Sequence, residues 1–320
     1  MRITIRADAT PHLGTGHVMR CLALAEELRA AGAVITWRGQ IYVPWIVTKL
    51  RTSNWAIEEA HPDAMVDADD TVADVVVVDS YAMDWEYRER LQARGIGVVV
   101  IADDFHTSLG PGDLWVNPGN EVDRDGTSAT TYLNGPAYIL LRSEIRGLRT
   151  LRESVFTRAN TKPKLTVLLG GTDAAGLGSL IDPIFRRFGQ EFHIIAGPKL
   201  SSINSVATWL PAGPELLREA ALSDLVVSPA GVSSWELVHI GVPVALVLGT
   251  ENQRGNYNWL TRNGLAFGMG SAEELQDDGV LAERLELAFA KAEKPPHTTA
   301  LTVDGQGTRR VSDAILQMFG

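Results

Sequence analysis

The chain has a single cysteine, Cys21, among its 320 residues. One thiol forms no internal disulfide, and such sparing use of cysteine is typical of proteins from a reducing compartment. The sequence also has no apolar run long enough to cross a bilayer, and its first residues predict a strand instead of the apolar core of a signal peptide. We therefore expect a soluble cytoplasmic protein.

Positive charge is also scarce, since 29 Lys and Arg residues stand against 39 Asp and Glu residues, a formal net charge of −10. Proteins that bind nucleic acid through its phosphates carry a basic face, so this balance argues against a nucleic-acid partner. It also disfavours a membrane acceptor, which a basic and apolar surface would serve. A small anionic substrate in a local basic pocket is compatible with the composition. The composition does not determine the oligomeric state.

What the sequence does have is a regular alternation of short, β-branched apolar runs with longer helical patterns. This alternation predicts an α/β protein, and the unbroken apolar runs predict parallel strands covered by helices on both faces. The predicted strands are 2–7, 33–37, 75–79, 97–102, 138–141, 165–169, 192–196, 224–228 and 243–248. The predicted helices are 17–31, 84–94, 178–188, 214–221, 232–240, 253–263 and 307–319.

The alternation lapses at residues 147–163, a polar and basic stretch without strand character, and begins again near Lys164. A chain of 320 residues suits two domains of moderate size better than one core. We predict an N-terminal domain over 1–150 and a C-terminal domain over 160–320. Each would be a Rossmann-like, doubly wound parallel sheet, and the two would face a cleft.

Two glycines, Gly14 and Gly16, separate the first predicted strand from the first predicted helix. Glycine permits a tight turn and a close approach of ligand to backbone, and a helix N-terminus favours negative charge. Met19 stands where a dinucleotide fingerprint has its third small residue, and no P-loop lysine follows, so neither motif is supported. We expect Gly14, Gly16 and Arg20 to contact the substrate.

His17 opens this helix directly after the glycines. The helix dipole favours a neutral imidazole there, which suits a general base that works near neutral pH. A capping or merely packed histidine is the alternative interpretation. The two flanking residues without side chains leave the imidazole room to face a ligand, and this favours the base.

The C-terminal half holds two more glycine-containing turns after strands, one at Gly170 and Gly171 and one at Gly231. Helix N-termini after these turns could offset the charge of a diphosphate. Ser233 and Ser234 follow in the first turn of the next helix, where hydroxyls and backbone amides could hold the same group.

Glu236 follows these serines and could accept both hydroxyls of a ribose, although a carboxylate near a helix N-terminus can also simply complement the dipole. Glu251, Asn252 and Gln253 gather at the end of strand 243–248, where hydroxyl-rich ligands usually bind in such folds. An ordinary solvated loop is the alternative for these three residues.

Polar residues also follow the strands of the N-terminal half. Asp8 follows the first strand, whereas Asp79, Ser80 and Tyr81 follow the third. A further group, Asp103, Asp104 and His106, allows a metal site, but paired aspartates after strands are more often turn and cap residues. We expect neither a metal nor another cofactor, and we find no serine elbow or exposed cysteine for a covalent mechanism.

Several motifs together carry a resemblance. "IRADATPHLGTGHVMRCLALAEELRAAGA" is followed in order by "VVVVDSYAMD", "YLNGPAYILLRSEI", "LLGGTDAAG", "SPAGVSSWELVHIGVPVALVL" and "ENQRGN". This series resembles the UDP-sugar hydrolases of pseudaminic acid biosynthesis and their spore-coat polysaccharide relatives. That family is similar to the two-Rossmann (GT-B) glycosyltransferases, notably the one that makes the peptidoglycan lipid intermediate.

The resemblance implies hydrolysis of UDP-2,4-diacetamido-2,4,6-trideoxy-β-L-altropyranose to UDP and the sugar, by attack of water at the anomeric carbon, with inversion and without a metal. It implies that His17 is the catalytic base, that Tyr81 lies beside the sugar, and that Glu236 and the "ENQR" loop belong to the nucleotide site. We count Tyr81 and Asp8 with His17 as catalytic candidates.

The chain departs from the family's pattern at Ser80, where members usually have histidine, and at residues 116–120, "VNPGN", where they usually have "DQN". Because of these differences, the sequence does not identify the sugar, nor whether the nucleotide is UDP. Two other functions compete with a hydrolase. One is a GT-B glycosyltransferase with a soluble acceptor, and the other is a protein that binds a sugar nucleotide without catalysis.

Overall fold

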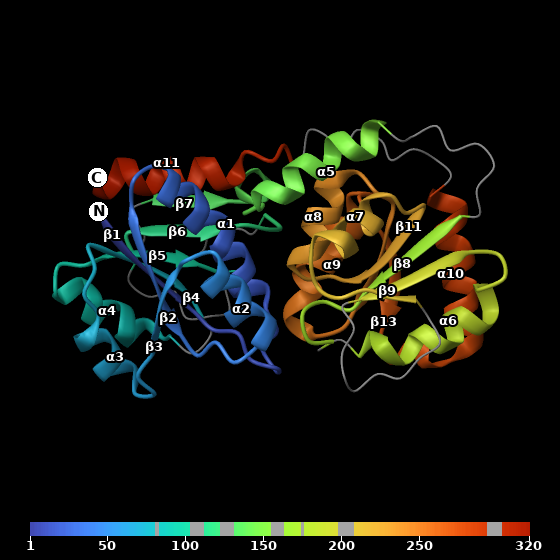
Figure 1. The fold of residues 1–320 in the computed structure, drawn as a ribbon, viewed down its shortest axis with the longest axis horizontal. Coiled ribbons are helices and arrows are strands. Elements are labelled where there is room, and N and C mark those ends of the chain that lie inside the picture. The colour runs from blue at the N-terminus through green and yellow to red at the C-terminus, as the bar shows by residue number, and fades with distance from the viewer. Residues whose placement is uncertain are drawn as a thin grey trace. The chain divides into compact units, whose positions relative to one another are not determined.

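The computed structural model describes residues 1–80, 83–102, 112–121, 131–154, 163–173, 176–197, 208–292 and 303–320 (Figure 1). The chain divides into two units. Unit 1 comprises Met1–Arg142 and Gly305–Gly320, and unit 2 comprises Ser143–Asp304.

Unit 1 is built on a parallel sheet of seven strands in the order β3-β2-β1-β4-β5-β6-β7. Because the chain winds outward in both directions from β1 and β4, the sheet is doubly wound and its order reverses between these two strands. The strands are β1 (Arg2–Ala7), β2 (Val34–Gly39), β3 (Ala56–Glu59), β4 (Val75–Asp79), β5 (Gly97–Ile101), β6 (Leu114–Asn117) and β7 (Thr131–Asn134).

Helices cover both faces of this sheet (Figure 1). On one face, Ile3 and Ile5 of β1 pack in a core with α1 (Gly16–Ala30), α2 (Pro44–Thr52) and α11 (Gly307–Phe319). On the other face, Val76 and Val78 of β4 pack with α3 (Ala64–Asp70) and α4 (Trp85–Ala93). The two faces follow from the alternation of side chains along each strand.

Unit 2 repeats the plan with six parallel strands in the order β10-β9-β8-β11-β12-β13. These are β8 (Lys164–Leu168), β9 (His193–Gly197), β10 (Thr208–Trp209), β11 (Leu225–Pro229), β12 (Val244–Leu248) and β13 (Phe267–Ser271). The α-helices are α5 (Ser143–Ser154), α6 (Ile181–Phe188), α7 (Pro214–Ala221), α8 (Val232–Ile240), α9 (Arg254–Arg262) and α10 (Asp278–Ala292). The order reverses between β8 and β11, so the predicted α/β class with two doubly wound sheets is confirmed.

One predicted strand, 138–141, is wrong. Its first residue ends a short 3₁₀ helix, η1 (Pro136–Tyr138), and residues 139–141 do not join the sheet. Leu140 and Leu141 are buried, as their apolar character predicts. However, the backbone N–H of Leu141 donates to Thr308 Oγ1 at 2.8 Å, and the Thr308 hydroxyl donates to the Leu141 carbonyl at 3.0 Å. A side chain of α11 therefore replaces the neighbouring strand as the hydrogen-bond partner.

The domain boundaries also differ from those predicted. The polar stretch after residue 142 forms helix α5, which opens unit 2. The last helix, α11, belongs to unit 1, where Val311 and Ile315 are completely buried beside α1. Sequence order alone assigned this helix to the C-terminal domain, but its apolar face completes the N-terminal core.

Candidate active site

The loop after β1 brings the chain to α1 at the carboxyl end of the unit 1 sheet, beside the point where the strand order reverses. Gly14 has a φ of 77° and its N–H donates to the Thr10 carbonyl at 2.9 Å, which closes a tight turn. The helix then begins at Gly16, and its N-cap, Thr15, makes no side-chain cap. His17 is thus the second residue of α1.

His17 lies against Asp79, the last residue of β4. The two atoms His17 Nδ1 and Asp79 Oδ1 are 2.6 Å apart, and both side chains are largely buried. Asp79 reaches α1 because it follows Val75 and Val77 at every second position, and both valines pack in the core that α1 shares. A carboxylate at this distance accepts the Nδ1 proton of a neutral imidazole, whose lone pair is then on Nε2.

Arg20 is also directed at Asp79. Its Nε donates to Asp79 Oδ2 and its Nη2 to Oδ1, each at 2.6 Å. Cys21 Sγ donates to Oδ2 at 3.2 Å. His17, Arg20 and Cys21 are spaced i, i+3 and i+4 and so share one face of α1. The guanidinium that the sequence suggested for substrate contact is therefore held by a buried carboxylate of its own unit.

Burial would raise the pKa of the Asp79 carboxyl, but its contacts with Arg20 and His17 outweigh that effect and hold the pKa well below its ordinary value of 3.8. Asp79 is therefore an anion near neutral pH. As an anion it has no proton to donate, so we assign the proton in the 2.6 Å contact to His17 Nδ1.

Asp8, a second buried carboxylate at this end of the sheet, has internal partners as well. Its Oδ1 accepts from Arg6 Nη1 at 2.5 Å and from the backbone N–H of Gln40 at 2.8 Å. Its Oδ2 accepts from the Ser80 hydroxyl at 2.6 Å. Burial would raise the pKa of Asp8, but the charge of Arg6 and these hydrogen bonds bring it below the ordinary value. Asp8 thus joins the ends of β1, β2 and β4.

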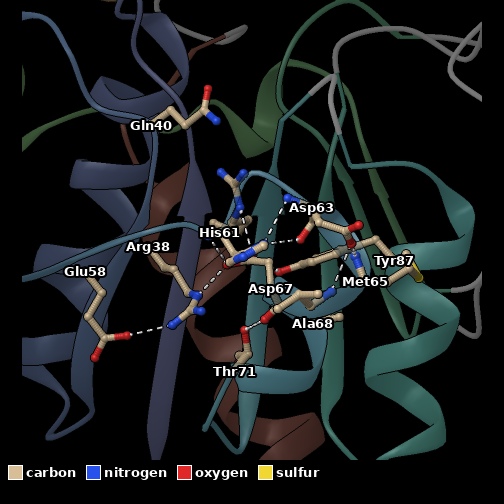
Figure 2. Close-up of polar contacts among 12 residues, drawn as sticks. Arg38, Gln40, Glu58, His61, Asp63, Met65, Asp67, Ala68, Thr71 and Tyr87 are labelled. Atoms are coloured by element: carbon tan, nitrogen blue, oxygen red, sulfur yellow. Dashed lines mark hydrogen bonds and ion pairs between the residues drawn. The ribbon is translucent and has the colours of Figure 1, made fainter.

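Arg6 also connects Asp8 to a second buried network, centred on Asp67 of α3. Arg38 Nε donates to Asp67 Oδ1 at 2.7 Å, and the Tyr87 hydroxyl donates to Oδ2 at 3.2 Å. Asp67 is fully buried, and Figure 2 shows these side chains converging on it from β2 and α4. Each charge meets an opposite charge inside unit 1, so we interpret the network as structural.

In unit 2, the turn after β8 contains polar atoms whose hydrogen-bonding capacity is not used. Gly170 has a φ of 73°, which favours glycine, and Gly171 follows it in the turn. Thr172 Oγ1 and Asp173 Oδ1 are buried and have no hydrogen-bond partner among the described residues. Burial raises the pKa of Asp173, although the N–H of Gly178 donates to its other oxygen at 3.0 Å. Sequence analysis selected the two glycines and missed this pair.

The next turn, at the start of α8, brings together several predicted residues. Gly231 is the N-cap of α8, and Gln253 Nε2 would lie 3.5 Å from a Cβ placed on it. The Ser234 hydroxyl donates back to the Gly231 carbonyl at 2.5 Å, whereas Ser233 is partly exposed. Gln253 Oε1 is buried without a partner among the described residues, and Glu236 is buried on α8. Gln253 thus lies at the N-terminus of α8, a neighbour that its position after strand β12 did not predict.

The other two residues of this loop make local contacts. Glu251 is exposed, and its carboxylate accepts from Arg254 Nε and Nη2 at 2.6 and 2.8 Å. The hydrogen bond from Arg254 lowers the pKa of Glu251. Asn252 Oδ1 accepts from the Thr250 hydroxyl at 2.6 Å. Both residues start the short 3₁₀ helix η3 (Glu251–Gln253) at the end of β12.

Tyr81, Asp103, Asp104 and His106 lie outside the described residues. Among the residues that the structure does describe, no three His, Cys, Asp or Glu side chains are grouped to hold a metal ion. Within the same residues, no helix combines the length and apolar character that a bilayer-spanning segment needs.

No protein-family model matches the chain. Among curated proteins, an uncharacterized protein of Methanocaldococcus jannaschii is 22% identical over 287 residues, which amount to 81% of this chain and 58% of that protein. The chain therefore spans less than two thirds of the length of this relative.

Among solved structures, MurG of Acinetobacter baumannii has a TM-score of 0.67 at 15% identity, with 99% of both chains covered. The spinosyn rhamnosyltransferase SpnG has a TM-score of 0.64 at 13% identity, covering 98% of this chain and all 100% of its own. A UDP-N-acetylglucosamine 2-epimerase has a TM-score of 0.60 at 13% identity, covering 100% of this chain and 97% of its own. The chain has a GT-B-like fold. At these identities the likeness shows the fold alone.

Proposed function

We propose that the protein is a nucleotide-sugar enzyme that breaks the glycosidic C–O bond of its donor, with His17 as the general base. The observation that carries this proposal is the buried pair of His17 and Asp79 at the carboxyl end of the unit 1 sheet. In open α/β sheets this end, next to the reversal of strand order, is where ligands bind. A histidine whose Nδ1 proton is held by a carboxylate presents a basic Nε2.

The same pair defines the chemistry. A nucleophile next to His17 would lose its proton to Nε2 as it attacks the anomeric carbon, and the developing imidazolium would be stabilised by Asp79. Among the described residues, the carboxylates of Asp8 and Asp79 are both engaged with arginines, which disfavours a covalent glycosyl-enzyme. A single displacement inverts the anomeric configuration.

Unit 2 is proposed to bind the nucleotide. The turns after β8 and β11 precede helices, and N–H groups at helix N-termini attract phosphate. Thr172, Asp173 and Gln253 contribute buried polar atoms without partners among the described residues at the turns that follow β8 and β12. Glu236 is proposed to accept the hydroxyls of the ribose, as the sequence suggested. The diphosphate would be bound by Ser233, Ser234 and backbone amides.

The nucleophile separates two candidate functions. A sugar hydroxyl or another soluble alcohol makes the protein a glycosyltransferase, and the fold it shares with SpnG and MurG favours this candidate. Water makes it a hydrolase, and the ordered series of motifs from "GTGH" to "ENQR" favours that one. Both use the same base and release the same nucleotide.

The test is nucleotide release from a panel of UDP- and CMP-sugars, followed by chromatography, with and without soluble hydroxyl acceptors. Release without acceptor identifies a hydrolase, release only with acceptor identifies a transferase, and binding without release leaves a sugar-nucleotide-binding protein. We expect turnover to persist in excess EDTA and the first-formed anomer, followed by rapid NMR, to be inverted. Loss in EDTA with recovery on adding Mg²⁺ would contradict the metal-independent mechanism.

His17→Ala is the variant that tests the base. General base catalysis contributes about 10²–10⁴-fold, so turnover should fall by that factor while UDP affinity measured by calorimetry stays the same. Gln306→Ala, which changes the N-cap of α11 in the same unit, is the control for handling and folding. Wild-type turnover in folded His17→Ala would remove the proposed base.

A further inference from the structure

We infer that Arg20 is a positioning residue for the proposed base, and that its guanidinium neutralises Asp79 and thereby keeps the His17 imidazole in the neutral, proton-accepting form. This inference rests on the proposed function for its catalytic consequence, but not for its electrostatic content. Sequence analysis had expected Arg20 to contact the substrate.

The geometry assigns this role to Arg20. Its Nε and Nη2 bind the two oxygens of Asp79 in a bidentate pair, both contacts being 2.6 Å. The Arg20 and Asp79 side chains are only 4% and 1% exposed, so solvent does little to screen their charges. A bidentate arginine–carboxylate pair is fixed in orientation as well as in charge.

Arg20 also approaches the imidazole itself, because its Nη2 lies 3.3 Å from His17 Nδ1. Since Nδ1 carries the proton that Asp79 accepts, this approach is a contact between a cation and an N–H group and not a hydrogen bond. A positive charge on the imidazole would be repelled by the Arg20 guanidinium at this distance. Asp79 alone would stabilise imidazolium, and Arg20 opposes that effect.

Two charged side chains, Asp79 and Arg20, have described contacts with the His17 imidazole. On α1 itself, Cys21 contributes a thiol that donates to Asp79. The other elements that pack against α1 present apolar residues to the shared core, among them Ile5 of β1, Trp37 of β2 and Val311 and Ile315 of α11.

The consequence is a base that works at lower pH than a simple histidine–aspartate pair. If Asp79 faced His17 without a counter-charge, imidazolium would persist to higher pH and less of the enzyme would hold the base form near neutrality. With Arg20 present, Asp79 can hold the proton of His17 on Nδ1 without also stabilising a second proton on Nε2.

The test is an NMR titration of the His17 ring in the full chain, with its signals assigned among the seven histidines by comparison with His17→Gln. We expect Arg20→Met to move the titration midpoint of His17 upward by about one pH unit or more. The acidic limb of kcat/KM should move with it. Arg20→Lys retains the charge and should bring both back toward the wild type.

Asp79→Asn tests the same coupling with the opposite sign. It removes the anion and leaves Arg20 beside Nδ1, so the His17 midpoint should move downward. If Arg20→Met does not fold, Asp79→Asn tests the electrostatic coupling to His17 in its place. Arg38→Met is the matched control, because Arg38 is another buried arginine paired with a buried aspartate, Asp67, in the same unit. It should leave the midpoint of His17 in place.

Two outcomes would overturn the inference. The first is an unchanged or lower midpoint in folded Arg20→Met, and the second is an unchanged midpoint in Asp79→Asn. If the first outcome came with weaker binding of UDP by Arg20→Met, Arg20 would be a ligand-binding residue instead. A wild-type protein without any turnover would refute the proposed function and leave the titration readable.

Discussion

Two buried aspartates, Asp8 and Asp79, each combine several donors around one carboxylate. Both pKa values lie below the ordinary 3.8, so the unfolded chain takes up protons before the folded one as the pH falls. Their contribution to stability is therefore complete above about pH 5 and is lost progressively as the pH falls through the unfolded-state and then the folded-state pKa values.

We predict that the free energy of unfolding in urea changes little between about pH 7 and pH 5 on account of these two groups and declines at about pH 4 and below. Asp8→Asn should be less stable at neutral pH and should show a shallower decline in acid, because one of the titrating groups is gone. An acid decline of the same depth in Asp8→Asn and the wild type would contradict this account.

At the same scale, Glu236 is proposed to bind the ribose from a buried position on α8. We predict that Glu236→Ala weakens UDP binding by about 1–3 kcal/mol, the cost of removing a charged hydrogen-bond partner, as measured by calorimetry. Glu286→Ala, an exposed glutamate that pairs with Arg187 on the same unit, should not change the affinity. Equal affinities for the Glu236→Ala variant and the wild type would mean that the carboxylate serves only the helix.

The predictability of the site from sequence differs from residue to residue. Gly14 lies in a turn and His17 lies at a helix start, as the motif predicted. To predict that Asp79 is the partner of His17, two periodicities would have to be combined across 62 residues of sequence. These are the alternate positions along β4 and the i, i+3, i+4 face of α1. Arg20 was predicted to contact the substrate, because the sequence does not show which carboxylate a buried arginine meets.

At the scale of elements, the Asp67 network ties α3 to β1, β2 and α4 through charges that are out of contact with water (Figure 2). Removing one partner of such a network leaves the others buried and uncompensated. We predict that Asp67→Asn lowers the free energy of unfolding by about 3–5 kcal/mol in urea denaturation.

The matched control lies two residues away on the same helix. Asp69 pairs with Arg90 at the surface, and both side chains are about half exposed, at 44% and 53%. Asp69→Asn should leave the urea midpoint nearly unchanged, because water replaces the lost partner. A similar loss in both variants would show that the helix itself, and not the buried network, accounts for the effect.

Strands with long β-branched runs, such as β4 and β5, were predictable because period and composition agree. The strands β6, β7 and β13 were not predicted, since four or five residues of mixed character give no clear period and acquire strand geometry by pairing with a neighbour. Residues 138–141 show the converse, a strand-like run whose last residue, Leu141, exchanges hydrogen bonds with Thr308 instead of a neighbouring strand.

At the scale of the molecule, the return of α11 to unit 1 makes the core of that unit depend on both ends of the chain. We predict that Ile315→Ala lowers the stability of unit 1 by about 2–5 kcal/mol, the cost of a buried Ile to Ala change. Hydrogen exchange should accelerate in α1, which α11 covers, while the amides of β11 in unit 2 keep their protection.

Gln317→Ala is the control for this prediction, since Gln317 lies on the exposed side of α11. It should leave exchange in both units as in the wild type. If Ile315→Ala loosened β11 as much as α1, the two units would unfold as one, and the division into separate cores would not describe their stability.

By itself, the sequence determined the α/β class, the restart of the strand and helix pattern near Lys164, and the turn at Gly14 that precedes His17. These features depend on local periodicity and on the conformational freedom of the backbone. Only the tertiary structure decided that Asp79 and Arg20 surround His17, that Asp8 is tied to Arg6, and that α11 belongs with unit 1. Those outcomes depend on which buried charge meets which partner and which apolar face needs a cover. Such choices are made between residues far apart in the chain, where composition and spacing carry no information about distance.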